Sequence, residues 1–91
     1  MIKLKRDTVL ADIFYEWAAD FKAVENLDEA GFWFGISIAF KNGCTINADA
    51  IEHVMFRAMV NASRPWINPE IAKEAELVLN RLNEAGTLRQ I

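Results

Sequence analysis

The sequence predicts a small α+β fold in which three helices pack on an antiparallel β-hairpin. Apolar residues recur at helical spacing in three separate stretches. Between Phe32 and Phe40, large apolar residues alternate with mainly small or polar ones, and the turn signal Lys41-Asn42-Gly43 follows. The alternative is an all-α bundle of four or five helices, in which this alternating stretch is itself a helix.

The first element in chain order is a short edge strand at positions 1–6, where apolar and basic residues alternate. From about Thr8 the period changes to that of a helix, which runs to about Glu25 and which Asp7 or Thr8 can cap. Its apolar stripe comprises Leu10, Ile13, Phe14, Trp17, Phe21 and Val24. This regular spacing makes the helix the clearest element of the sequence.

The stretch from Gly31 to Asn47 decides between the two folds. In a strand, its large apolar residues share one face and Trp33 points outward. The residues on the shared face are Phe32, Phe34, Ile36, Ile38 and Phe40. In a helix, apolar residues lie on nearly all sides, and Gly43 ends the helix in the left-handed conformation. We favour the hairpin because two glycines and several aromatic or β-branched residues weaken a helix.

Two further helices follow. Asn47 can cap the first of them, and Pro65 disfavours helical geometry in the residue before it. Asn68-Pro69-Glu70 then begins the last helix, and Gly86 is its expected end. The inward-facing residues are Ile51, Val54, Met55, Ala58, Met59 and Ala62, followed by Ile71, Ala75, Val78, Leu79 and Leu82. Positions 87–91 either add a terminal strand or cover the core.

Composition indicates one cytoplasmic domain that spans residues 1–91. An apolar content of 53% suffices for a single core in a chain of this length. The lone cysteine, Cys44, excludes an internal disulfide and suits a reducing compartment. No run of about 20 apolar residues is present, and acidic residues interrupt the first apolar stretch where a signal peptide would need a continuous one.

The sequence contains no motif typical of catalysis or of metal binding. Asp49, His53 and Arg57 are spaced four residues apart on a predicted helix, but no nucleophile lies beside them. One histidine and one cysteine cannot supply the usual three or four zinc ligands. A glycine-rich phosphate loop is also missing. We therefore expect a protein that is not an enzyme and that binds no cofactor.

Asp12, Glu16 and Asp20 form a row of carboxylates on the first predicted helix, which we call the acidic ridge. Like charges at this spacing slightly destabilise a helix. Our hypothesis is that the ridge docks on a basic protein, such as a nucleic-acid-binding protein whose phosphate contacts it imitates. Glu25, Asp28 and Glu29 would extend it. The competing interpretation is an ordinary solvated face.

Several apolar residues lie outside the predicted core stripes. Phe56 and Val60 share a helix side with His53, and Leu77 lies on the polar side of the last helix. Trp66 lies in a connector, and Trp33 faces outward in the hairpin. Aromatic residues are enriched at interfaces, so these positions predict self-association as a homodimer. The competing interpretation is that neighbouring elements cover them.

Taken together, these patterns predict a small, acidic, non-enzymatic protein-binding module that acts as an inhibitor or adaptor of a larger protein machine. The alternative is a nucleic-acid-binding accessory protein that uses a basic N-terminal arm of Lys3, Lys5 and Arg6. Without those three charges, the net charge of −3 becomes −6, which opposes phosphate binding by the rest of the chain.

Overall fold

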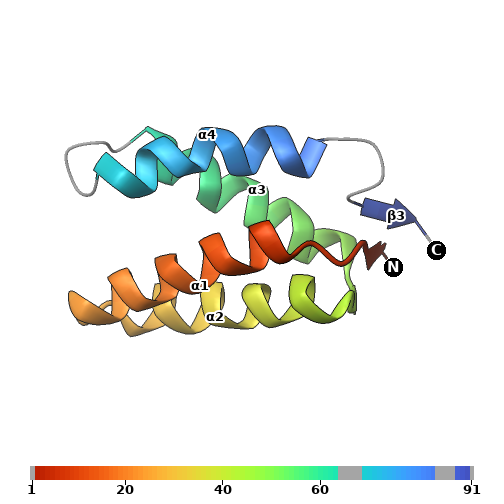
Figure 1. The fold of residues 1–91 in the computed structure, drawn as a ribbon, viewed down its shortest axis with the longest axis horizontal. Coiled ribbons are helices and arrows are strands. Elements are labelled where there is room, and N and C mark those ends of the chain that lie inside the picture. Colours follow the sequence, from red (N-terminus) through yellow and green to blue (C-terminus); the bar gives the residue numbers. More distant parts are fainter. Residues whose placement is uncertain (1, 64–68, 84–87, 91) are drawn as a thin grey trace.

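The computed structural model describes residues 2–63, 69–83 and 88–90, which form four helices and three short strands (Figure 1). In chain order these are β1 (Ile2–Leu4), α1 (Thr8–Ala23), α2 (Leu27–Asn42), β2 (Thr45–Ile46), α3 (Ala48–Ala62), α4 (Pro69–Asn83) and β3 (Leu88–Gln90). The chain is therefore mainly helical, with a small antiparallel sheet. The helical-bundle alternative fits this structure, and the predicted β-hairpin was wrong.

The signals at the two ends of α2 explain why this stretch is a helix. The Asn26 side chain accepts a hydrogen bond from the backbone N–H of Glu29 at the N-terminus, and Asp28 lies in the same first turn. At the C-terminus, Gly43 has φ 64° and its N–H donates to the carbonyl of Ala39. These caps outweigh the weak helix preference of the glycines and aromatics between them.

The centre of the core is an aromatic cluster between α1 and α2. Phe14, Trp17, Trp33 and Phe40 are fully buried. The Trp33 ring stacks on Phe14 at 5.0 Å between ring centroids and meets Trp17 edge-on at 4.8 Å. The outward position predicted for Trp33 was therefore wrong, because a helix directs this side chain toward α1.

Helices α3 and α4 form a second antiparallel pair that packs on the first pair (Figure 1). Their buried residues are Ile51, Val54 and Ala58 in α3 and Ile71, Ala75, Val78 and Leu82 in α4, all of them predicted. Met59 was expected to face inward but is 58% exposed, because it lies at the margin of the α3 stripe. A hydrogen bond of 2.8 Å from Arg81 to Asp7 joins α4 to the start of α1.

The sheet closes one end of the bundle. Strand β1 pairs with β2 in the register Ile2↔Ile46 and with β3 in the register Lys3↔Arg89. The predicted N-terminal strand is confirmed, but it is the central strand and not an edge. The strand alternative for the C-terminal residues is the one observed. Among the described helices, none combines the length and the apolar character that crossing a membrane requires.

Candidate functional site

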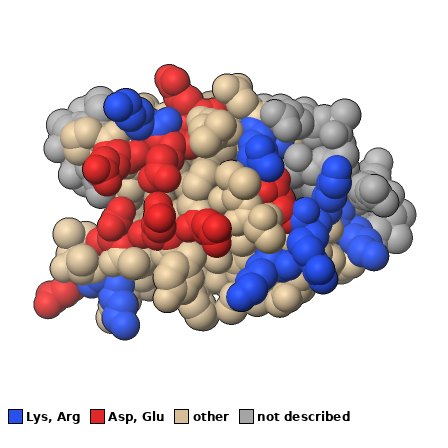
Figure 2. All heavy atoms as spheres, viewed as in Figure 1, with Lys and Arg blue, Asp and Glu red and all other residues tan. Residues whose placement is uncertain are grey.

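Carboxylates from two helices gather on one side of the molecule. Helix α1 contributes the predicted ridge, and α4 contributes Glu70 and Glu74 across the contact between the helices. Figure 2 shows most of the acidic side chains toward one end of the visible face and most of the basic ones toward the other, with some basic side chains bordering the acidic end. We define the acidic surface as Asp12, Glu16, Asp20, Glu70 and Glu74.

Glu74 is the most perturbed carboxyl group on the acidic surface. Its half-buried side chain accepts a hydrogen bond of 3.3 Å from the indole N–H of Trp17. Burial raises the pKa of Glu74, the negative charges of Glu16, Asp20 and Glu70 raise it further, and the hydrogen bond from Trp17 opposes them. The folded structure thus disfavours the negative charge of Glu74, first because the carboxyl group is partly buried and second because other carboxylates lie close to it.

Only some of the residues predicted for the acidic ridge and its extension lie on the acidic surface. Asp12 and Glu16 are exposed and Asp20 is half-buried, so all three contribute to the surface. Glu29 does not extend the ridge as predicted. Its carboxylate accepts hydrogen bonds from the indole of Trp33 at 2.9 Å and from Arg57 at 3.0 Å. Sequence reasoning missed this inward role because it placed Trp33 outside the core.

In the row of Asp49, His53 and Arg57 on α3, the last two residues contact α2. The guanidinium of Arg57 lies 4.1 Å from the centroid of the Phe32 ring and pairs with Glu29, so it joins α3 to α2. The exposed His53 ring meets Phe32 edge-on at 6.1 Å. Within the described ranges, no three His, Cys, Asp or Glu side chains are arranged to hold a metal ion.

The predicted apolar contact residues differ in exposure. Phe56 is 62% exposed and Leu77 is 50% exposed, so both present apolar area to solvent. Val60 is half-buried on α3. Trp33 belongs to the core and is excluded as a contact residue, and Trp66 lies outside the described residues.

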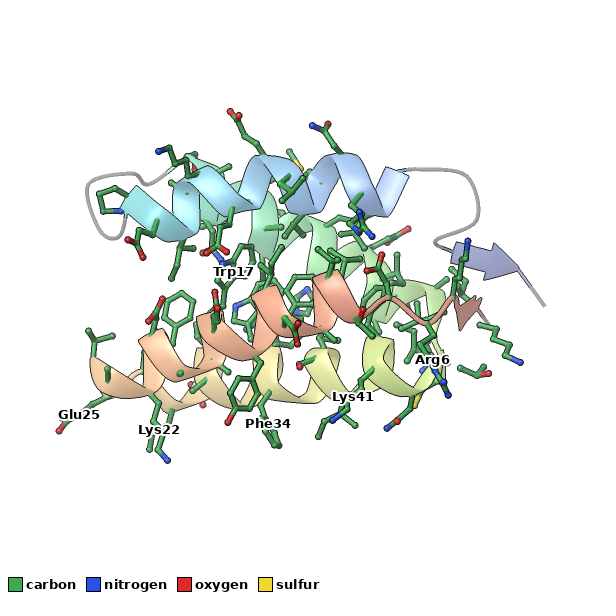
Figure 3. The ribbon with its side chains drawn as sticks, in the orientation of Figure 1. Arg6, Trp17, Lys22, Glu25, Phe34 and Lys41 are labelled. Atoms are coloured by element: carbon green, nitrogen blue, oxygen red, sulfur yellow. The ribbon has the colours of Figure 1, made fainter. Side chains whose placement is uncertain are left out.

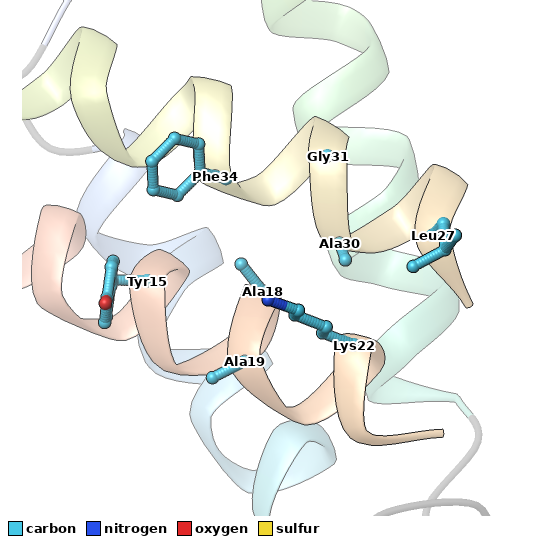
Figure 4. Close-up of a pocket in the computed structure, with 8 residues that line it drawn as sticks. All are labelled: Tyr15, Ala18, Ala19, Lys22, Leu27, Ala30, Gly31 and Phe34. Atoms are coloured by element: carbon cyan, nitrogen blue, oxygen red, sulfur yellow. The ribbon is translucent and has the colours of Figure 1, made fainter. Parts of the chain in front are cut away.

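A groove that sequence reasoning did not predict runs between α1 and α2 (Figure 4). It has a volume of about 530 Å³ and is mainly apolar. Its lining residues, which define the outer groove, are Tyr15, Ala18, Ala19, Lys22, Leu27, Ala30, Gly31 and Phe34. Tyr15 and Phe34 lie with their ring centroids 6.2 Å apart, and both are exposed, as is Leu27. The hairpin prediction could not indicate this groove, because it placed the Phe34 side chain in the core.

Comparison with known proteins gave no match to a family model, a curated protein or a solved structure.

Proposed function

We propose that this protein is a non-enzymatic protein-binding module that self-associates and that acts in the cytoplasm as an inhibitor or adaptor of a larger protein machine. The observation that carries the proposal is the acidic surface, where carboxylates from α1 and α4 gather and their repulsion adds to burial in raising the pKa of Glu74. Such repulsion lowers the stability of the isolated protein, and a cationic partner would relieve it.

The chemistry of this surface selects a basic protein as the partner. Asp12 and Glu16 are exposed along one helix, and Glu70 adds a further exposed carboxylate from the neighbouring helix. Lysine and arginine side chains can pair with such carboxylates over an extended area. Proteins that bind nucleic acids carry basic surfaces of this kind, and the carboxylates would occupy the positions of phosphates on them.

Affinity capture with matched charge-reversal variants tests this proposal. The baits are the wild type, the double variant Asp12→Lys/Glu16→Lys, and the control Glu52→Lys/Glu76→Lys, which changes exposed positions on α3 and α4 by the same total charge. We expect the wild type and the control to retain one protein at low salt, and the acidic-surface variant to lose it. Retention should also weaken as salt increases.

Circular dichroism of each bait establishes that it is folded. Equal capture by a folded acidic-surface variant, or no specific capture by the wild type, would contradict the proposal.

One observation favours nucleic acid as a second candidate partner. Lys3, Lys5 and Arg6 line a shallow depression of about 310 Å³ beside Asn42 and Gly43. Figure 3 shows Lys41 at the same end of the molecule as Arg6, so the basic residues are clustered. In this case the wild type should shift DNA or RNA in a gel with steep salt dependence, and the capture experiment should give equal results for all three baits.

A further inference from the structure

The outer side of α2 is apolar but has no partner in the described part of the chain. Its inner side buries Trp33, Ile36 and Phe40, whereas Leu27, Phe34 and Ile38 are 68%, 48% and 42% exposed. Tyr15 of α1, which is 58% exposed, and the outer groove continue this apolar area. A helix that is apolar on all sides is normally buried on all sides, so the outer side of α2 should be covered by another molecule.

We propose that a second copy of this chain covers this side, with the two copies related by a two-fold axis between Gly31 and Phe34 and with their α2 helices antiparallel. The inference rests on the self-association in the proposed function and assigns that self-association to a surface. It places the interface on α1 and α2, and not at Phe56 on α3.

The spacing of the exposed residues on α2 fits such a two-fold arrangement. Leu27, Gly31, Phe34 and Ile38 follow the alternating four- and three-residue spacing of a coiled-coil seam. This spacing is the same in both directions along the helix. An antiparallel copy therefore places Phe34 over the partner's Gly31, and Ile38 against the partner's Leu27. The same surface is used by both copies, as a two-fold interface requires.

Gly31 supplies the space that this packing needs. A Cβ atom built at Gly31 meets nothing within 4 Å, and the same is true of Gly35. No contact with the described residues therefore requires glycine at these positions, although each lowers helix stability by about 1 kcal/mol relative to alanine. A glycine opposite an aromatic side chain lets two helices approach closely, which gives Gly31 a function in the dimer.

The outer side of α2 has opposite charges at its two ends, and the proposed two-fold axis brings these opposite charges together. Figure 3 shows Glu25 at one end and Lys41 at the other, with Phe34 between them. Both charged side chains are exposed. The two-fold axis brings Lys41 of one copy to the partner's Glu25 and the partner's Asp28, so two such clusters flank the apolar contact.

The size of the molecule also suits this interface. Its extents are 37 × 22 × 22 Å, so a long side has a projected area of roughly 800 Å², close to the area that each partner buries in a stable interface of standard size. A dimer of standard size would therefore use nearly the whole of the side that α1 and α2 form.

Sedimentation equilibrium of the full chain tests the proposal. We expect the wild type to be dimeric, Phe34→Glu to dissociate with a Kd raised roughly thirty-fold or more, and Phe56→Glu to remain dimeric. Phe56 is a matched control because it is also an exposed phenylalanine on a helix. A monomeric wild type, a dimeric Phe34→Glu variant, or dissociation by Phe56→Glu would each overturn the proposal.

A charge-swap series decides the question independently of whether Phe34→Glu folds. Lys41→Glu and Glu25→Lys should each weaken the dimer. The double variant should bind more tightly than either single variant, because the charges at positions 25 and 41 pair again across the axis, but less tightly than the wild type, because Asp28 stays acidic. Failure of the double variant to bind more tightly than the single variants would overturn the assigned arrangement. A dimer that captures no protein partner would instead refute the partner-binding proposal and leave this interface standing.

Discussion

Gly31 and Gly43 allow one substitution to be compared in two opposite environments. A methyl group at Gly31 meets no atom of the described residues within 4 Å, whereas at Gly43 it lies 3.3 Å from the carbonyl oxygen of Leu4. Gly43 also has φ 64°, a left-handed conformation that L-residues disfavour. Gly31→Ala should therefore raise the free energy of unfolding, and Gly43→Ala should lower it.

The expected magnitudes follow from these environments. Replacing glycine by alanine inside a helix gains about 0.5–1 kcal/mol when nothing obstructs the new methyl group. The left-handed conformation costs an L-residue about 1–2 kcal/mol, and the Leu4 carbonyl must also move. The two variants should thus differ by about 2 kcal/mol, or about 10 °C in Tm for a domain of this size.

Urea and thermal denaturation followed by circular dichroism measure both effects. The substitutions should be made in the Phe34→Glu background, because self-association would otherwise add to the apparent stability. If Gly31→Ala were no more stable than its parent, an atom of the same chain would have to occupy the outer side of α2. If Gly43→Ala left the free energy of unfolding unchanged, the left-handed conformation assigned to Gly43 would be wrong.

Two further predictions concern Glu74 in α4 and Glu25 in the turn after α1. Glu74→Gln keeps an acceptor for Trp17 and removes a charge that burial and the nearby carboxylates disfavour, so it should stabilise the protein at about pH 7 by a few tenths to about 1 kcal/mol. The raised pKa of Glu74 means that the folded state binds the carboxyl proton of Glu74 more tightly than the unfolded chain does. The free energy of unfolding of the wild type therefore falls as pH rises from the ordinary glutamate pKa of 4.5 through the higher pKa of the folded state. The gain from Glu74→Gln should accordingly shrink in urea titrations at about pH 4, and a gain independent of pH would contradict the assigned cause. Glu25 has φ 60°, so Glu25→Gly should stabilise the turn by about 1 kcal/mol in the same assay when it is made in the Phe34→Glu background, where the proposed contact of Glu25 across the dimer is absent. A loss of stability in that background would contradict the left-handed geometry.

The sequence predicted the elements whose periodicity and caps agree with each other. Helix α1 has one apolar stripe and the predicted cap, where Asp7 accepts a hydrogen bond of 3.1 Å from the backbone N–H of Leu10. Helix α4 likewise buries the predicted Ile71, Ala75 and Val78. Local pattern sufficed in these helices because each has a polar side that identifies the apolar one.

The candidate site could be predicted only in part, because it depends on which helices become neighbours. Asp12, Glu16 and Asp20 were visible as a row on one helix. The addition of Glu70 and Glu74 requires the packing of α4 beside α1, which local pattern does not specify. The same limit applies to the inward role of Glu29, which depends on contacts with α3.

The failure of the hairpin prediction and the proposed dimer have the same physical origin. In α2, apolar residues on every side satisfy both a period of two and a helical period, so the pattern alone cannot distinguish a strand from a helix. The hairpin interpretation assumed that this chain must bury its own Phe34 and Ile38, and a strand was the conformation that achieved it. The structure exposes both residues while Trp33 fills the core instead. If a second copy buries Phe34 and Ile38, each side of α2 has a partner, and the helix is the conformation that the full assembly requires.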